Sequence, residues 1–259
     1  MTAERVPAGG VVSPSVVYHC PRASSPNWSP IWAEAPRTAR FVDADHGGAA
    51  FLHSDAAFAW DDEHLYITAQ FEERDVWTTG ATRTGIVWQE NTLEVLLASD
   101  GAIYNLSINA TGEPQELLFV WNDAYQRGGR YDVAELDLAT AAPMVIGGDS
   151  GPHHRRGRRW LFDDWNLSGL QTSVQVDGTL NQRLQLDRGW SVQLSLPWEG
   201  LAHVLDGVPT AGSRLRVALA RHQMLDQRGS QYATVWSWHQ AGSAGMYAPE
   251  SYPVVELSA

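Results

Sequence analysis

The 259-residue chain contains no lysine and only one cysteine, Cys20. Without lysine it cannot form a Schiff base or hold a phosphate through an ammonium group. A lone cysteine excludes an internal disulfide, a zinc site made of several thiolates and an iron–sulfur cluster. No apolar run approaches the roughly 18 residues that a membrane-spanning helix needs. We therefore expect no membrane partner.

Positive charge is also scarce. The 18 basic residues, all arginine, stand against 30 acidic ones, and the formal net charge is -12 at pH 7. This balance disfavours binding to nucleic-acid phosphates or anionic lipid, so no nucleic-acid partner is expected.

The first thirty residues contain no signal-peptide core, which predicts a cytoplasmic protein, or a secreted one only if a signal peptide was removed. Aromatic residues are plentiful: 12 Trp, 8 Tyr and 6 Phe.

Apolar and polar residues alternate in several segments, as is typical of half-buried strands. Clear cases are residues 65–71, 190–196 and 215–219. Helix signals are few, with one short helix expected after Pro197. The pattern predicts an all-β fold, an antiparallel β-sandwich with long loop excursions and at most short helices. We expect an N-terminal arm over residues 1–30, a single domain over 31–259 and a long loop excursion over 122–169.

The Asp100-Gly101 pair predicts a hairpin turn within residues 92–109, because both positions tolerate positive φ. Counting outward from the turn gives one apolar face, with the pairs Leu97 and Tyr104, Val95 and Leu106, and Leu93 and Ile108. The other face has the pairs Leu96 and Asn105, Glu94 and Ser107, and Thr92 and Asn109. Antiparallel sheets commonly leave one face in water, so this polar face is expected to be solvated. The alternative is the floor of a polar binding site.

Five fragments, in their order along the chain, resemble the carbohydrate-binding module family 9-like proteins, including stand-alone bacterial members. They are WDDEHLYITAQFEERDVW, VWQENTLEVLLASDGAIYNLSINATGEP, DWNLSGLQTSVQVDGTLN, DRGWSVQLSLPW and VWSWHQAGSAGMYAPESYPVVELS, and the likeness covers about residues 31–259. The resemblance implies a β-sandwich that binds sugars, with tryptophan stacked on a pyranose ring and polar side chains holding hydroxyls. Some members bind calcium, so a structural calcium is compatible with the resemblance; no other cofactor is expected.

Matched residue by residue, the resemblance makes Trp88 the stacking tryptophan and Glu94 the sugar-binding acid. Asn105 and Ser107 fall on the strand where the family presents further polar contacts. Position alone leaves Trp88 divided between the core and a ligand platform, but its polar neighbours favour a platform on a loop. A flat ring with carboxylate and amide groups at its edge suits a sugar, which has C–H groups on its faces and hydroxyls around its rim.

The later part of the chain completes the expected substrate-binding set with Arg221, Trp238 and Tyr247. The second stacking tryptophan of the sugar-binding modules is replaced by about Met246, and the His that follows it in stand-alone members is Tyr247 here. Arg221 lies in the apolar phase of its strand, so a structural ion pair with a buried acid is the alternative to a ligand contact. Trp236 and Trp238 share a face by alternation, and we expect at least one of them to pack in the core.

Other polar clusters carry weaker signals. The basic run from His153 to Arg159 is interpreted as a solvated loop rather than a metal or phosphate site. The acidic groups near Asp43 and Asp61 lack the spacing of a calcium-binding loop. No metal ligand and no catalytic residue is therefore assigned.

Non-catalytic carbohydrate binding is the leading interpretation. The alternative is a glycan-processing enzyme, a hydrolase or lyase acting on glycosides, in which Asp163 or Asp164 joins Glu94. A retaining glycosidase holds its two carboxyl groups about 5 Å apart, and no GxSxG nucleophile motif is present. A third interpretation is a haem-binding sandwich of cytochrome type, disfavoured because CxxCH and lysine are absent. Its candidate axial ligands are the nine His with Met144, Met224 and Met246.

Overall fold

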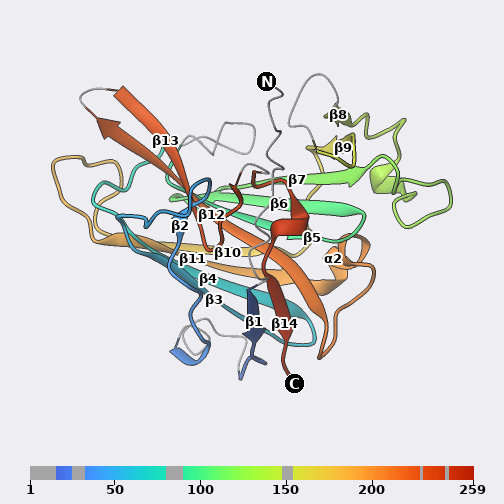
Figure 1. Cartoon of the computed structure of the whole chain (residues 1–259), viewed down its shortest axis with the longest axis horizontal. Helices are drawn as coiled ribbons and strands as arrows, with labels where there is room; N and C mark the ends of the chain where they lie inside the picture. Colours follow the sequence, from blue (N-terminus) through green and yellow to red (C-terminus); the bar gives the residue numbers. More distant parts are fainter. Residues whose placement is uncertain (1–15, 25–32, 80–89, 148–153, 228–229, 243–244) are drawn as a thin grey trace, which may run out of the picture.

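The computed structural model of the chain describes residues 16–24, 33–79, 90–147, 154–227, 230–242 and 245–259, apart from the side chains of residues 226–231. Its elements are mostly strands, and they form two sheets that face each other (Figure 1). The fold is the all-β antiparallel sandwich that the sequence predicts. Trp88 and His153 lie outside the described residues.

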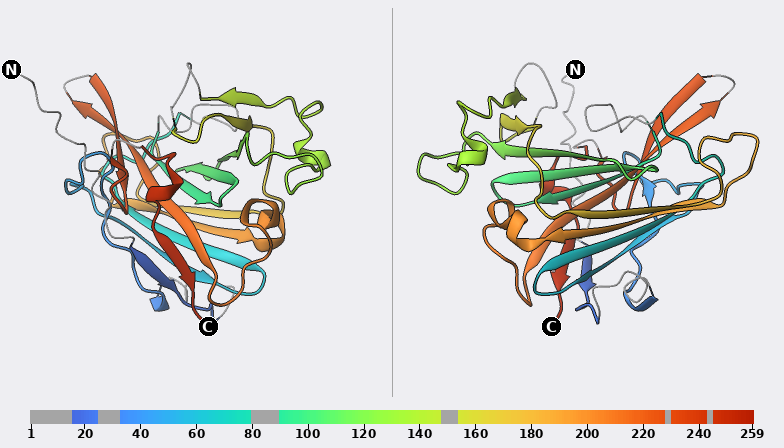
Figure 2. Two further views of the ribbon diagram at one scale, coloured as in Figure 1. Left: turned by 45° about the vertical axis from the view of Figure 1, so that its right-hand side comes forward. Right: turned by 180° about the vertical axis from the view of Figure 1, so that it is seen from behind.

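Within the described residues the larger sheet has ten strands, and its central strands carry the residues of interest. Its main path is β1 (Val17–Cys20), β14 (Val254–Leu257), β12 (Arg214–Gln227), β5 (Thr92–Ala98), β6 (Ala102–Asn109), β7 (Pro114–Trp121), β9 (Arg159–Phe162) and β8 (Met144–Ile146). Off this path, β13 (Ser230–Ser237) pairs with β12, and β2 (Val42–Asp43) pairs with β13. All these pairs are antiparallel except β1 with β14. The ribbon of β12 and β13 extends beyond the rest of the sheet (Figure 2).

The smaller sheet is antiparallel throughout and follows the order β10 (Gln171–Asp177), β11 (Gly189–Pro197), β4 (His64–Glu72) and β3 (Ser54–Trp60). Helical elements are short: the α-helix α2 (Trp198–Leu205) and the 3-10 turns η2 (Ala134–Leu136) and η4 (Pro249–Ser251). The helix α2 starts after Pro197 and stops at Asp206, whose left-handed φ of 67° ends the helical path. No helix in the described ranges is both long and apolar enough to cross a bilayer.

The core lies between the sheets and is filled by the alternate residues of each strand. The hairpin of β5 and β6 has the expected register, with Val95 opposite Leu106 and Glu94 opposite Ser107. Val95 and Leu106 are completely buried and pack in the same cluster as Ile67 of the smaller sheet. Burying each such side chain contributes about 1.5–3 kcal/mol. The period-2 pattern therefore identified the correct inner face.

The turn that fixes this register uses its glycine for a different reason from the one expected. Neither Asp100 nor Gly101 has positive φ. A Cβ atom on Gly101 would instead overlap the ring and hydroxyl of the buried Tyr131, with Cε2 only 2.7 Å away. The glycine is therefore required by the close approach of Tyr131 rather than by the backbone conformation.

The outer face of β5 and β6 is not solvated, which corrects the sequence interpretation. Glu94, Asn105 and Ser107 are only 5%, 1% and 6% exposed. Their neighbours on this face are apolar residues that form a second cluster beneath the C-terminal segment: Leu96, Ile103, Phe119, Trp121, Leu161, Ala218 and Tyr252, with Met246 and Tyr247 packed against them. Because such a patch gains free energy by leaving water, the C-terminal segment covers the polar side chains along with it.

Two of the predicted segments contain strands that their local pattern does not indicate. The segment 122–169, expected to be a loop excursion, contains η2, β8 and β9, and the two strands extend the large sheet beyond β7. The segment 1–30, expected to be an arm, contains β1, which buries Tyr18 and Cys20 in the core. Each of these short strands is stabilised by a partner strand, which a local pattern does not reveal.

Candidate functional site

Glu94 is the centre of a polar network on the outer face of the larger sheet. Its Oε1 accepts hydrogen bonds from Asn105 Nδ2 at 2.6 Å and from the Tyr247 hydroxyl at 3.1 Å. Its Oε2 lies 3.0 Å from His222 Nε2. Three neighbouring strands supply these groups, since β5 lies between β6 and β12, and the C-terminal segment supplies Tyr247. The network is therefore built on three adjacent antiparallel strands of the sheet.

The Tyr247 hydroxyl occupies a particular place in this network. It accepts a hydrogen bond from Asn105 Nδ2 at 2.9 Å and donates one to Glu94. Ser107 Oγ approaches Asn105 Oδ1 at 3.4 Å, which is a weak contact. Glu94, Asn105, Ser107 and Tyr247 were all expected at the site, and the structure brings them together.

The charge of Glu94 is maintained despite its burial. Burial raises its pKa, but the hydrogen bond and charge of His222, with the hydrogen bonds of Asn105 and Tyr247, outweigh that effect and hold the pKa below its usual value. The carboxylate is therefore ionised at neutral pH and acts only as an acceptor. Burial, followed by the nearby Glu94 charge, raises the pKa of Tyr247 well above its usual value, so its hydroxyl stays protonated.

His222 is not among the site residues predicted from the sequence, although strand alternation indicates which face of the sheet it occupies. It lies next to Arg221 on β12, so alternation places it on the opposite face from Arg221 and on the same face as Glu94. Only the pairing of β12 with β5, which sequence reasoning did not predict, brings His222 to the carboxylate.

Arg159 is a second residue near the network that the sequence pattern does not indicate. The basic run predicts a solvated loop at this position, but Arg159 belongs to β9 and is 1% exposed. Its guanidinium carbon lies 5.2 Å from the Phe119 ring centroid, 4.9 Å from that of Trp121 and 5.6 Å from that of Tyr247. Within the described ranges its Nε and Nη1 have no hydrogen-bond partner. Burial lowers its pKa from the usual value, and the nearby phenol groups of Tyr247 and Tyr252 oppose that effect.

Arg221 does not join the Glu94 network. It points into the core, where its Nη2 lies 2.8 Å from Glu73 Oε2 and its Nη1 donates to Ser54 Oγ at 2.9 Å. Its Nε donates to Gln223 Oε1 at 3.0 Å. Burial lowers its pKa to about 10, with Glu73 opposing the shift, so the ion pair persists at neutral pH. The alternative interpretation, a structural ion pair, describes its environment.

Trp238 is also separate from the network. It is 4% exposed and packs in the core, with its ring centroid 5.4 Å from that of Phe58 and 6.3 Å from that of Tyr18. Trp236 is buried in the same core cluster. Both tryptophans of the VWSWH segment thus contribute to packing.

The acids proposed as partners of Glu94 lie elsewhere. Asp163 and Asp164 line a cavity of about 630 Å³ together with Glu199 and His203 of α2, and Glu94 does not line it. The hydrogen-bond partners of Glu94 in the described part of the chain are an amide, a phenol and an imidazole. Asp163 and Asp164 therefore do not provide the second carboxylate that the enzyme alternative requires.

The acids considered for calcium act in turns. Asp43 Oδ1 accepts the backbone N–H of His46 at 2.8 Å, and Asp61 Oδ1 accepts that of His64 at 2.8 Å. Across the described ranges there is no group of three or more His, Cys, Asp or Glu side chains arranged to hold a metal ion.

Comparison with known proteins gives matches in structure but not in sequence. No protein-family model and no curated protein matches the chain. A carbohydrate binding module family 9 protein from Caldicellulosiruptor kristjanssonii in complex with cellotriose has a TM-score of 0.55 at 11% identity, over 93% of each chain. A family 9 module from the same organism in complex with glucose has a TM-score of 0.54 at 11% identity, over 93% of this chain and 95% of the other.

A candidate carbohydrate-binding protein from Bacteroides uniformis gives a TM-score of 0.59 at 11% identity, over 94% of this chain and 99% of that one. Because these matches cover nearly the whole of both chains, the protein has the fold of the family 9 modules. The family resemblance in the sequence is thus confirmed at the level of the fold.

Proposed function

We propose that this protein binds carbohydrate without catalysis, through a site centred on Glu94. The observation that carries the proposal is the place of the Tyr247 hydroxyl, which accepts from Asn105 and donates to Glu94. A sugar hydroxyl forms this same pair of bonds when an amide and a carboxylate hold it. In the proposal, a sugar hydroxyl replaces that of Tyr247 between these two residues.

The surroundings of the network suit this ligand. His222, Met246 and Tyr247 are partly exposed and lie around Glu94. In the proposal, a sugar reaches the buried Glu94 between these side chains. Trp88, six residues before Glu94 in the chain, is proposed as the platform for the apolar face of the ring. The shared fold supports the proposal, because the family 9 modules are solved with cellotriose and glucose. A glucose-type pyranose is the first ligand to test.

The electrostatics favour binding over hydrolysis. A glycosidase needs a carboxylic acid that stays protonated near neutral pH, and burial without compensating hydrogen bonds produces it. The network around Glu94 has the opposite effect, because it lowers the pKa of the carboxyl group. We therefore propose that Glu94 accepts hydroxyl hydrogen bonds and does not donate a proton.

Calorimetric titration with mono- and oligosaccharides, with a product assay on the same samples, tests the function. Glu94→Gln should lose about 1–3 kcal/mol of binding free energy, because a charged acceptor is replaced by a neutral amide. Glu63→Gln changes an exposed carboxylate of the same type and is the matched control. Trp88→Ala is the second variant, and it should also remove most of the affinity.

Three outcomes separate the two functions. Binding without product supports the proposal. Product formation that Glu94→Gln abolishes while sugar still binds makes Glu94 catalytic. Failure of every sugar to bind the folded wild-type protein removes the proposed function while leaving the fold unchanged.

A further inference from the structure

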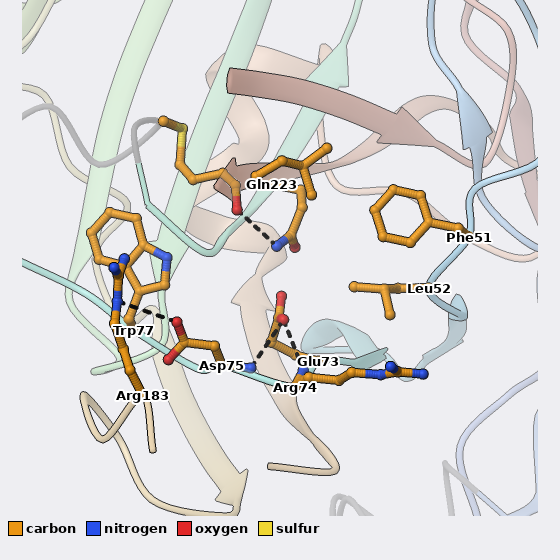
Figure 3. Close-up of a pocket in the computed structure, with 10 residues that line it drawn as sticks. Phe51, Leu52, Glu73, Arg74, Asp75, Trp77, Arg183 and Gln223 are labelled. Carbon is orange, nitrogen blue, oxygen red and sulfur yellow. Dashed lines mark hydrogen bonds and ion pairs between the residues drawn. The ribbon is translucent and has the colours of Figure 1, made fainter. Parts of the chain in front are cut away.

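A cavity of about 460 Å³ opens away from the Glu94 network, where the chain leaves β4 and β12 continues toward β13 (Figure 3). Its lining comes from four parts of the chain: Phe51 and Leu52; Glu73, Arg74, Asp75 and Trp77; Arg183; and Gln223, Met224 and Leu225. None of Glu94, Asn105, Ser107, His222 and Tyr247 lines it. The cavity is therefore a separate feature of the molecule.

The deep wall of this cavity is held rigidly. Glu73 pairs with Arg221 at 2.8 Å, and its other oxygen accepts the backbone N–H of Arg74 at 2.8 Å. Gln223 Oε1 accepts from Arg221 and, at 3.3 Å, from Asn91 Nδ2. Because these buried groups satisfy one another, they shape the cavity without needing a ligand.

The side walls are aromatic and open. Phe51 and Leu52 lie on one side of the cavity, and Trp77 lies on the other (Figure 3). Phe51 is 66% exposed, and its ring centroid is 4.8 Å from that of Trp236, which supports it from beneath. Covering an exposed phenylalanine ring with a ligand removes apolar surface from water, which is favourable in free energy. A fixed aromatic ring beside a cavity is therefore well suited to contact a ligand.

Asp75 supplies an unused acceptor in the same place. Its Oδ2 lies 3.4 Å from Arg183 Nε, but its Oδ1 is buried and has no hydrogen-bond partner in the described part of the protein. Leaving a buried acceptor unpaired costs free energy that a donor on a ligand recovers. Burial raises the pKa of Asp75, with Glu73 and Asp187 adding to the effect and Arg183 opposing it.

We propose that this cavity is a second carbohydrate site, which holds one pyranose residue between Phe51 and Trp77 with a sugar hydroxyl donating to the Asp75 carboxylate, whose side chain is 36% exposed. The cavity volume lies within the range of about 300–1,000 Å³ that small-molecule sites occupy. The C–H faces of the sugar meet the aromatic walls, and its rim of hydroxyls meets Asp75 and the exposed Arg74. This site shares no residue with the Glu94 site, so it does not depend on the proposed function.

The test follows the indole N–H signal of Trp77 in two-dimensional NMR spectra of the full chain carrying Glu94→Gln. The signal is assigned by its loss in Trp77→Phe. Glucose, galactose, xylose and cellotriose are titrated at millimolar concentrations, and at least one of them should shift the Trp77 signal to saturation. Phe51→Ala and Asp75→Asn should each weaken that binding about tenfold. Met144→Ala, which changes a 49% exposed side chain that does not line the cavity, should leave it unchanged.

The outcomes distinguish the two sites. If no sugar moves the Trp77 signal, the second site is overturned. The Glu94 site is still supported in that case if the wild type binds sugar and Glu94→Gln abolishes the binding. A shift that survives both Phe51→Ala and Asp75→Asn also overturns the proposal, because the contact is then non-specific. If sugar saturates the Trp77 signal and Glu94→Gln binds sugar as tightly as the wild type, the second site is supported and the Glu94 site is contradicted.

Discussion

The Tyr247 hydroxyl donates to Glu94 Oε1 at 3.1 Å across a separation of 153 residues. This bond fastens the C-terminal segment to the outer face of the large sheet, where Tyr247 and Tyr252 pack against the apolar cluster around Phe119 and Trp121. One residue thus both closes the face of the sheet and takes the position proposed for a ligand hydroxyl. Stability and binding should therefore respond differently to its removal.

Tyr247→Phe is expected to lower the free energy of unfolding by about 1 kcal/mol, because one buried hydrogen-bonded hydroxyl is lost. Sugar affinity should stay the same or increase, because the group that competes for Asn105 and Glu94 is gone. Urea unfolding and calorimetric titration of the same protein measure the two effects. A large loss of affinity would instead make the Tyr247 hydroxyl a direct ligand contact.

Gly101→Ala should destabilise the protein by about 1–3 kcal/mol, the usual effect of overpacking a well-filled site. The added methyl group would overlap Tyr131, which is buried and unable to move aside freely. Gly48→Ala is the control, because a Cβ at that position meets no atom within 4 Å. Combining Gly101→Ala with Tyr131→Phe should recover part of the loss, since it removes the nearest atom. Equal stability of the two alanine variants would contradict the steric explanation.

The sequence was sufficient for the hairpin of β5 and β6, because a turn signal and a two-residue period together allow only one register that buries Leu93, Val95 and Leu97. Those signals are local. The cover over Glu94 depends on a segment about 150 residues later, and the contact with His222 depends on which strand pairs with β5. Neither follows from the pattern within one strand.

The two buried arginines show the same limit of prediction from local sequence. The phase of Arg221 among its apolar neighbours predicts an inward-facing side chain, and its burial agrees, but its partner Glu73 lies 148 residues away. The charged and polar neighbours of Arg159 predict a solvated side chain, and that prediction is wrong. Its burial results from the pairing of β9 with β7 beside Trp121, which composition alone cannot predict.

His239 should make stability depend on pH between about 6.5 and 4. Burial lowers its pKa from 6.5 to about 4 in the folded protein. Between these pH values the His239 imidazole binds a proton in the unfolded chain but stays neutral in the folded chain. The free energy of unfolding therefore decreases as the pH falls through that range. Because a tenfold difference in proton affinity between the folded and unfolded chains corresponds to about 1.4 kcal/mol, the full effect is about 3 kcal/mol.

Urea unfolding at several pH values measures this dependence. His239→Gln should flatten the curve between pH 6.5 and 4, because the titrating group is gone. His203→Gln alters an exposed histidine of α2 and should keep the wild-type slope. An unchanged slope in His239→Gln would show that His239 does not cause the effect.

Arg159 and Arg221 form a natural comparison, because both are buried arginines between aromatic rings but only one has an acidic partner in the described residues. Arg221→Met should cost about 3–5 kcal/mol, since it leaves the carboxylate of Glu73 buried without its cation. Arg159→Met removes a charge that no carboxylate among the described residues neutralises, and its aromatic contacts are worth only about 0.5–2 kcal/mol. Arg159→Met should therefore leave the free energy of unfolding unchanged or raise it, as measured by urea unfolding at pH 7. A loss as large as that of Arg221→Met would mean that the three rings around Arg159 compensate its desolvation fully.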